Sequence, residues 1–61
     1  MELFTIEEVA EIMDVHPESV RRWIRRGELR GFKPGGKLLK VRRTDLEEFI
    51  KDAEREPTTQ R

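Results

Sequence analysis

An interruption at positions 14–17 constrains the fold of this 61-residue chain more than any other sequence feature. On each side of it, apolar residues recur at the three- and four-residue spacing of an amphipathic helix. Within it, Pro17 disfavours helical conformation at His16 but suits the first position of a new helix. The chain is therefore expected to form two short helices joined by a tight turn instead of one long helix.

The segment before the interruption has the sequence of a capped helix. Thr5 and Glu8 form the Thr-x-x-Glu pattern of a capping box. Phe4 precedes the cap, where it can pack back onto the helix as a hydrophobic staple. The expected apolar face consists of Val9, Ala10, Ile12 and Met13. We therefore predict a first helix over residues 6–13.

The segment after the interruption predicts a second helix over residues 17–26, with His16 as its N-cap. Gly27 follows where a left-handed glycine commonly ends a helix. The apolar face consists of Val20, Trp23 and Ile24. This spacing favours Trp23 as a core residue over a base-stacking platform. Two short helices, a brief turn and the apolar Val15 inside that turn outline a helix-turn-helix.

The remaining chain predicts a hairpin and a third helix. Gly35-Gly36 is a hairpin-type turn, so residues 31–42 are expected to form a two-stranded wing. The strand register is ambiguous and leaves either Leu38 or Leu39 exposed. Thr44-x-x-Glu47 is a second capping box, which predicts a helix over residues 44–53, with a start at Arg42 or Arg43 as the alternative.

These elements together predict a mostly α fold with a small β-hairpin. We expect a winged helix-turn-helix domain over residues 1–53, with three helices and a two-stranded wing, and a flexible C-terminal tail over residues 54–61. A chain of this length buries a thin core, and it has no cysteine to form a disulfide.

Charge is distributed unevenly although the chain is neutral, with 13 basic and 13 acidic side chains. Residues 20–43 hold ten of the basic residues and a single acid, Glu28. The flanking segments hold the other acids. Because binding is local, the basic block matters more than the total. It indicates either a phosphate-rich partner or a basic face balanced by the acidic flanks.

The outer face of the second helix is the strongest candidate site. It carries Glu18, Ser19, Arg21, Arg22, Arg25 and Arg26. In a helix-turn-helix the first turns of the second helix enter the major groove, which places Glu18, Ser19 and Arg22 nearest the bases. The other three arginines are better placed for phosphates. The alternative is a solvated face with pairs such as Glu18 with Arg22, but such pairs contribute only about 0.3–0.5 kcal/mol and do not account for four arginines.

The predicted wing adds three lysines, which are Lys33, Lys37 and Lys40. A narrow glycine tip with basic residues can reach the phosphates of a minor groove. The alternative for Lys33 and Lys40 is protection of an edge strand against pairing with another chain. For Lys37, which lies beside the tip, DNA contact is favoured.

Several classes of function find no support in the sequence. No Ser or Thr has an adjacent base, and the acids have the spacing of solvated helix faces, so we expect no enzyme, no cofactor and no metal site. No apolar run is long enough to span a membrane, and the N-terminus lacks the pattern of a signal peptide. We expect a cytoplasmic, nucleoid-associated protein without a small-molecule effector.

The stretches PESVRRWIRRGEL and GGKLLKVRRTDLEEF resemble the recognition helix and the wing with its closing helix of small winged helix-turn-helix domains of the excisionase/MerR type. The resemblance covers about residues 3–50. It implies base contacts from Glu18 and Arg22, phosphate contacts from Ser19, Arg21 and Arg25, and minor-groove contact from the wing. His16 departs from this family, where a small cap residue is common.

The expected function is therefore sequence-specific binding of double-stranded DNA. The role is either that of a phage-excisionase-like recombination directionality factor or that of a small transcription regulator. Partners would be an integrase or recombinase, or further copies of the chain on adjacent sites. The alternative is a protein-interaction adaptor whose arginine-rich helix docks an acidic partner.

Overall fold

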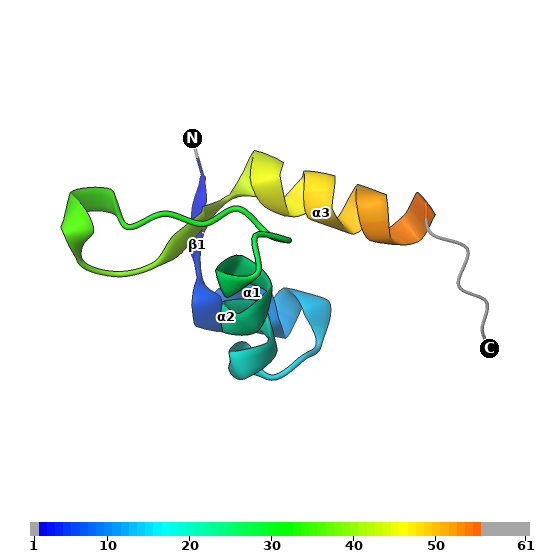
Figure 1. Ribbon diagram of the computed structural model, residues 1–61, viewed down its shortest axis with the longest axis horizontal. Helices are drawn as coiled ribbons and strands as arrows, with labels where there is room; N and C mark the ends of the chain where they lie inside the picture. The colour runs from blue at the N-terminus through cyan, green and yellow to red at the C-terminus, as the bar shows by residue number, and fades with distance from the viewer. Residues whose placement is uncertain (1, 56–61) are drawn as a thin grey trace.

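A computed structural model describes residues 2–55 of the chain. Figure 1 shows α1 and α2 packed together beneath a small sheet, with the loop around η1 and the helix α3 extending to opposite sides. In chain order the elements are β1 (Leu3–Thr5), α1 (Ile6–Met13), α2 (Pro17–Arg25), the 3-10 turn η1 (Pro34–Gly36), β2 (Lys40–Arg42) and α3 (Arg43–Arg55). The predicted fold class, a mostly helical winged helix-turn-helix, is confirmed.

Helix α1 covers the residues expected for the first helix, because both of its ends are capped. The Thr5 hydroxyl accepts from the Glu8 N–H at 3.0 Å, and the Glu8 carboxylate accepts from the Thr5 N–H at 2.8 Å. At the other end Asp14 adopts a left-handed conformation, φ +59°. The Val15 N–H then donates to the Ala10 carbonyl at 2.9 Å. This closure pulls the chain out of the helix and into the turn.

Helix α2 begins and ends almost where the sequence predicts. Pro17 occupies its first position and His16 its N-cap, as expected. The helix ends at Arg25, one residue earlier than predicted, and Gly27 follows with φ +79°. The Glu28 N–H donates to the Trp23 carbonyl at 2.8 Å, so the last turn is closed by a left-handed glycine.

The predicted strand pairing in the wing is wrong. The sheet has two antiparallel strands, but β2 pairs with the N-terminal strand β1, with Phe4 opposite Val41. The segment before Pro34 contributes a single bridge, between Phe32 and Lys40. Pro34 has no N–H to donate, and the chain around it turns through η1, so no ladder continues along the loop. The wing is therefore a loop closed by one bridge.

Helix α3 begins at Arg43, which was the alternative start, and continues to Arg55. Thr44 therefore lies inside the helix, and the predicted capping box at Thr44 is wrong. Strand β2 leads directly into the helix, and the Arg43 N–H donates to the Glu2 carbonyl at 3.0 Å. The residue just before β1 thereby satisfies a free donor of the first turn of α3. Residues 54 and 55, predicted as tail, are helical, and the rest of that tail lies outside the described residues.

The core lies where α1, α2, β2 and α3 meet. Its fully or nearly fully buried members are Ile6, Val9, Ala10, Val20, Leu29, Val41 and Leu46. Ile12, predicted on the apolar face of α1, is instead 52% exposed. One of the two wing leucines is exposed, as expected: Leu39 packs against the core and Leu38 points to solvent. Val15 in the turn is only partly buried against this core.

Candidate nucleic-acid interface

The start of α2 is held rigidly, which fixes the direction of its first turn. The His16 imidazole accepts from the Glu18 N–H through Nδ1 at 3.0 Å. Pro17 follows with the fixed φ angle of a helix start. A cap from a side chain together with a proline leaves this end little freedom to fray, so the side chains of the first turn have defined positions.

The inner face of α2 attaches the helix to the rest of the domain. Val20 is completely buried, and Trp23 packs against Phe49 of α3 with ring centroids 4.9 Å apart. A Cβ atom at Gly31 would lie 3.0 Å from the Ile24 side chain, so the loop after α2 passes close to this face. Trp23 is therefore a packing residue, as its spacing predicted, and the opposite face of α2 must point outward.

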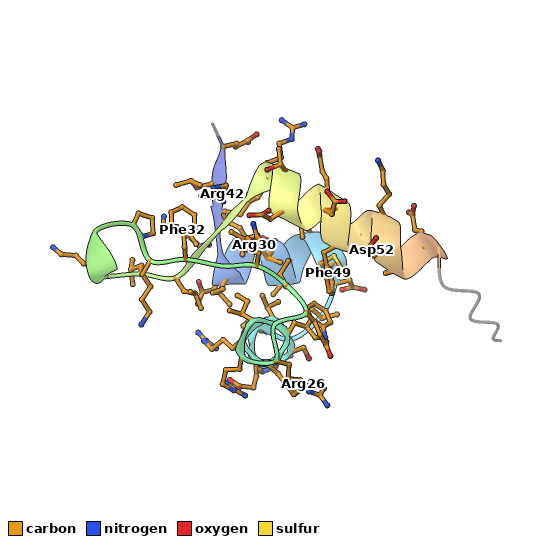
Figure 2. The ribbon with its side chains drawn as sticks, turned by 45° about the horizontal axis from the view of Figure 1, so that its top comes forward. Arg26, Arg30, Phe32, Arg42, Phe49 and Asp52 are labelled. Carbon is orange, nitrogen blue, oxygen red and sulfur yellow. The ribbon has the colours of Figure 1, made fainter. Side chains whose placement is uncertain are left out.

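The outer face of α2 presents all six residues predicted for it. Glu18, Arg21, Arg22, Arg25 and Arg26 are exposed and Ser19 is half-buried. Figure 2 shows Arg26 on the outer side of α2, whereas Phe49 of α3 lies on the other side of that helix. A single helix face therefore offers four guanidinium groups, one carboxylate and one hydroxyl to solvent.

Ion pairs arrange these charges in a way that the sequence did not predict. The Glu18 carboxylate lies 3.6 Å from Arg21 and 3.4 Å from Arg25. Arg21 also reaches Glu7 of α1 at 3.5 Å. The i, i+4 pair considered from the sequence, Glu18 with Arg22, is not formed. Carboxylates therefore hold two of the four arginines on this face.

Arg22 and Arg26 differ from those two arginines. The Arg22 guanidinium donates to the Ser19 hydroxyl at 3.4 Å, and no carboxylate within residues 2–55 pairs with Arg22 or Arg26. A hydroxyl partner orients a guanidinium without neutralising it. Arg22 therefore lies in the first turns of α2 as an oriented cation that an incoming anion or base edge can bind directly.

The wing lysines do not share one environment. Lys33 and Lys37 flank η1 and are exposed, while Lys40 lies half-buried in β2. The backbone of Lys40 exchanges two hydrogen bonds with Phe32, at 2.7 and 2.9 Å, which close the loop. The tip of the wing is therefore basic, and Lys40 lies at its base.

Two arginines of the basic block serve the fold. The Arg42 guanidinium lies over the Phe32 ring at 4.7 Å from its centroid and pairs with Asp45 at 3.4 Å. Arg43 pairs with Glu47 at 3.1 Å and with Glu2 at 2.9 Å. The hydrogen bond to Glu47 and the charge of Glu2 raise the pKa of Arg43 above its usual value. These cations hold the wing base and the N-terminal strand onto α3.

Arg30 was counted in the basic block but not as a site residue. It is exposed and lines a surface depression together with Phe49 and the acids Asp45, Glu48 and Asp52. In Figure 2 it lies between the wing and α3, away from Arg26. Arg30 therefore belongs to the α3 side of the molecule and not to the outer face of α2.

Within residues 2–55 no three His, Cys, Asp or Glu side chains gather in a way that could hold a metal ion. No helix in that range is long and apolar enough to cross a membrane. Residues 3–53 match the family model described as a helix-turn-helix domain. No curated protein and no solved structure matches the chain.

Proposed function

Because the chain belongs to the helix-turn-helix domain family, whose partner is DNA, we propose that it binds double-stranded DNA sequence-specifically through α2. The observation that supports this most directly is the division of α2 into a buried inner face and an outer face of four arginines. Arg suits both bidentate phosphate contact and the reading of guanine. Domains of this family typically bind DNA without catalysing a reaction, which agrees with the proposed binding role.

In this proposal the outer face of α2 enters the major groove. Arg22, which has a hydroxyl partner and no carboxylate, reads guanine, and Glu18 accepts from the exocyclic amine of cytosine. Ser19 orients Arg22 and can reach a phosphate. The other three arginines of the face, which are Arg21, Arg25 and Arg26, contact phosphates in this proposal. Arg21 and Arg25 first release their carboxylate partners.

The wing is proposed to reach an adjacent minor groove. The exposed positions of Lys33 and Lys37 around η1 support phosphate contacts from both. Lys40 is the weakest of the predicted contacts, because it is half-buried and its backbone closes the wing. A basic tip on a short loop adds affinity without adding sequence information.

The test is selection of bound duplexes from a random library, followed by variants on the selected site. Arg22→Ala is expected to relax preference at one base pair, at a cost of about 1–3 kcal/mol. Lys37→Ala is expected to weaken all duplexes alike and to lower the slope of log K against log salt by about one unit. Lys51→Ala, which removes an exposed cation from α3, is the matched control and should change neither. Equal weakening of every sequence by Arg22→Ala would contradict the base-reading assignment.

A DNA-binding domain of this size makes few contacts, so a single copy should bind weakly and with strong salt dependence. We therefore propose that several copies bind adjacent sites, or that a recombinase holds the domain in place. The role is that of an excisionase-like recombination directionality factor or of a small transcription regulator, in the cytoplasm at the nucleoid. Failure to shift any duplex at low salt would favour the adaptor alternative, because nonspecific phosphate contact should survive there.

A further inference from the structure

Leu38 is an exposed apolar side chain in the loop that carries Lys33 and Lys37. Its residue is 67% exposed, and within residues 2–55 only Ile12, at 52%, is another exposed large hydrophobic residue. A single exposed leucine is common on protein surfaces. The position of Leu38 is what needs an explanation, because it follows Lys37 directly and precedes Leu39, which packs against the core.

The surroundings of Leu38 connect the wing with α2. Leu38 and Leu39 line a surface depression of about 210 Å³ together with Arg21 of α2 and with residues at the start of α1, which are Thr5, Ile6 and Glu7. Arg21 lies on a flank of the outer face that we propose for DNA. The leucine is therefore exposed on the side where wing and recognition helix come together, and not on the opposite side of the domain.

We infer that Leu38 is an apolar DNA contact, which packs against the deoxyribose rings and base edges of the minor groove beside the wing lysines. This inference rests on the proposed DNA binding. Apolar side chains are used in this way by minor-groove proteins, where leucine is among the residues that press against or between base steps. A contact of this kind displaces no counterions, so it adds affinity that salt does not remove.

The charges around Leu38 favour DNA over a protein partner as its occupant. Lys37 is adjacent in sequence and Lys33 lies on the other side of η1. Arg21 lines the same depression as Leu38, beside its ion-pair partner Glu7. A polyanion that covers the leucine neutralises the two exposed lysines, and it competes with Glu7 and Glu18 for Arg21. A second copy of the chain that covered Leu38 would have to bury these cations or supply acids to pair with them. Binding of a second copy is the alternative outcome of the test.

The test compares Leu38→Ala, Leu38→Met and Ile12→Ala by fluorescence anisotropy, on one duplex holding a single selected site, across a series of salt concentrations. If DNA buries the exposed surface of Leu38, Leu38→Ala should weaken binding about tenfold at every salt concentration. The slope of log K against log salt should not change. Leu38→Met keeps the apolar volume and should bind within about twofold of the unchanged protein. Ile12→Ala, which truncates the exposed side chain on α1, should bind normally.

Two controls separate the possible failures. Thermal unfolding should be unchanged in Leu38→Ala, because the side chain is exposed; Leu38→Met provides a folded apolar variant in any case. Unchanged single-site affinity in Leu38→Ala would overturn the inference while leaving the proposed DNA binding intact. A loss that appears only on duplexes with two adjacent sites would overturn it in favour of a second copy as the occupant. Absence of any duplex binding by the unchanged protein would instead remove the proposed function.

Discussion

The charge of Glu18 is predicted to suppress binding to generic DNA. Its carboxylate lies 3.6 Å from Arg21 and 3.4 Å from Arg25, and its side chain is half exposed. Glu18→Gln keeps the size and shape of the side chain but removes the charge. Both arginines then lose a competing partner, so we expect the variant to bind DNA of arbitrary sequence more tightly than the unchanged protein does.

The magnitude follows from the two ion pairs. Each is exposed to solvent, and exposed pairs are worth about 0.2–1 kcal/mol, so removing both lowers the free energy of generic binding by about 0.4–2 kcal/mol. That is about a 2- to 30-fold gain in affinity. The outer face also gains one net positive charge, which should steepen the slope of log K against log salt by about 0.9. Loss of the proposed cytosine contact should at the same time remove about 1–3 kcal/mol of discrimination between base pairs.

The assay is fluorescence anisotropy with a selected duplex and a scrambled duplex of equal length, each titrated at several salt concentrations. Glu47→Gln is the matched control, because Glu47 is also exposed and also pairs with an arginine, at 3.1 Å, but on α3. Urea unfolding of each variant shows whether binding differences arise from folding. Weaker generic binding by Glu18→Gln would refute the reasoning, since Glu18 would then be assisting phosphate contact instead of competing with it.

Three further predictions concern the turns and packing that position α2, and urea unfolding measures each of them. Gly27→Ala should lower the free energy of unfolding by about 1–2 kcal/mol, because the new Cβ meets nothing within 4 Å but φ is +79°. Asp14→Gly should raise it by about 0.5 kcal/mol, since relief of a left-handed φ outweighs the entropy of glycine. Val20→Ala should lower it by about 2 kcal/mol through lost burial, out of about 3–9 kcal/mol expected for a domain of this length.

The helices of the helix-turn-helix were predictable because their signals are local. Thr5 and Glu8 act on each other within one turn, and His16, Pro17 and Gly27 act on the ends of the helix beside them. Such interactions depend on the residue types and their spacing alone. The left-handed Asp14 was not predicted, because aspartate is common in many turn conformations and nothing in its spacing selects this one.

The sheet could not be predicted in the same way, because its pairing is not local. Strand β1 has only three residues, too few for an alternating pattern, and its partner β2 lies more than thirty positions away. The glycine pair at the wing tip suggested a nearby partner instead. Pairing with β1 is favoured because it places Val41 in the packed core, where this side chain is completely buried. The segment before the wing tip pairs with β2 only through the bridge between Phe32 and Lys40.

The candidate site was predictable as a face but not as a set of contacts. Helical periodicity determines that Val20 and Trp23 point inward, and this leaves the arginines outside. Which arginine pairs with which acid depends on side-chain rotamers and on Glu7, which belongs to another helix. The sequence therefore indicates a basic surface, and the structure distinguishes the paired Arg21 from the hydroxyl-bound Arg22.

The ion pairs between the acids and the basic block bear on how selectively the proposed site binds DNA. Acids of the N-terminal segment reach into the basic block, with Glu7 and Glu18 on Arg21 and Glu2 on Arg43. In the proposed complex, DNA of any sequence has to displace Glu7 and Glu18 from Arg21, whereas only a matching sequence recovers that free energy through the proposed base contacts of Arg22 and Glu18. Nonspecific binding draws almost wholly on phosphate contacts, so in this proposal the acids reduce it more than they reduce specific binding. A protein that must find a few sites among a large excess of others gains more from a high ratio of specific to nonspecific affinity than from high affinity itself.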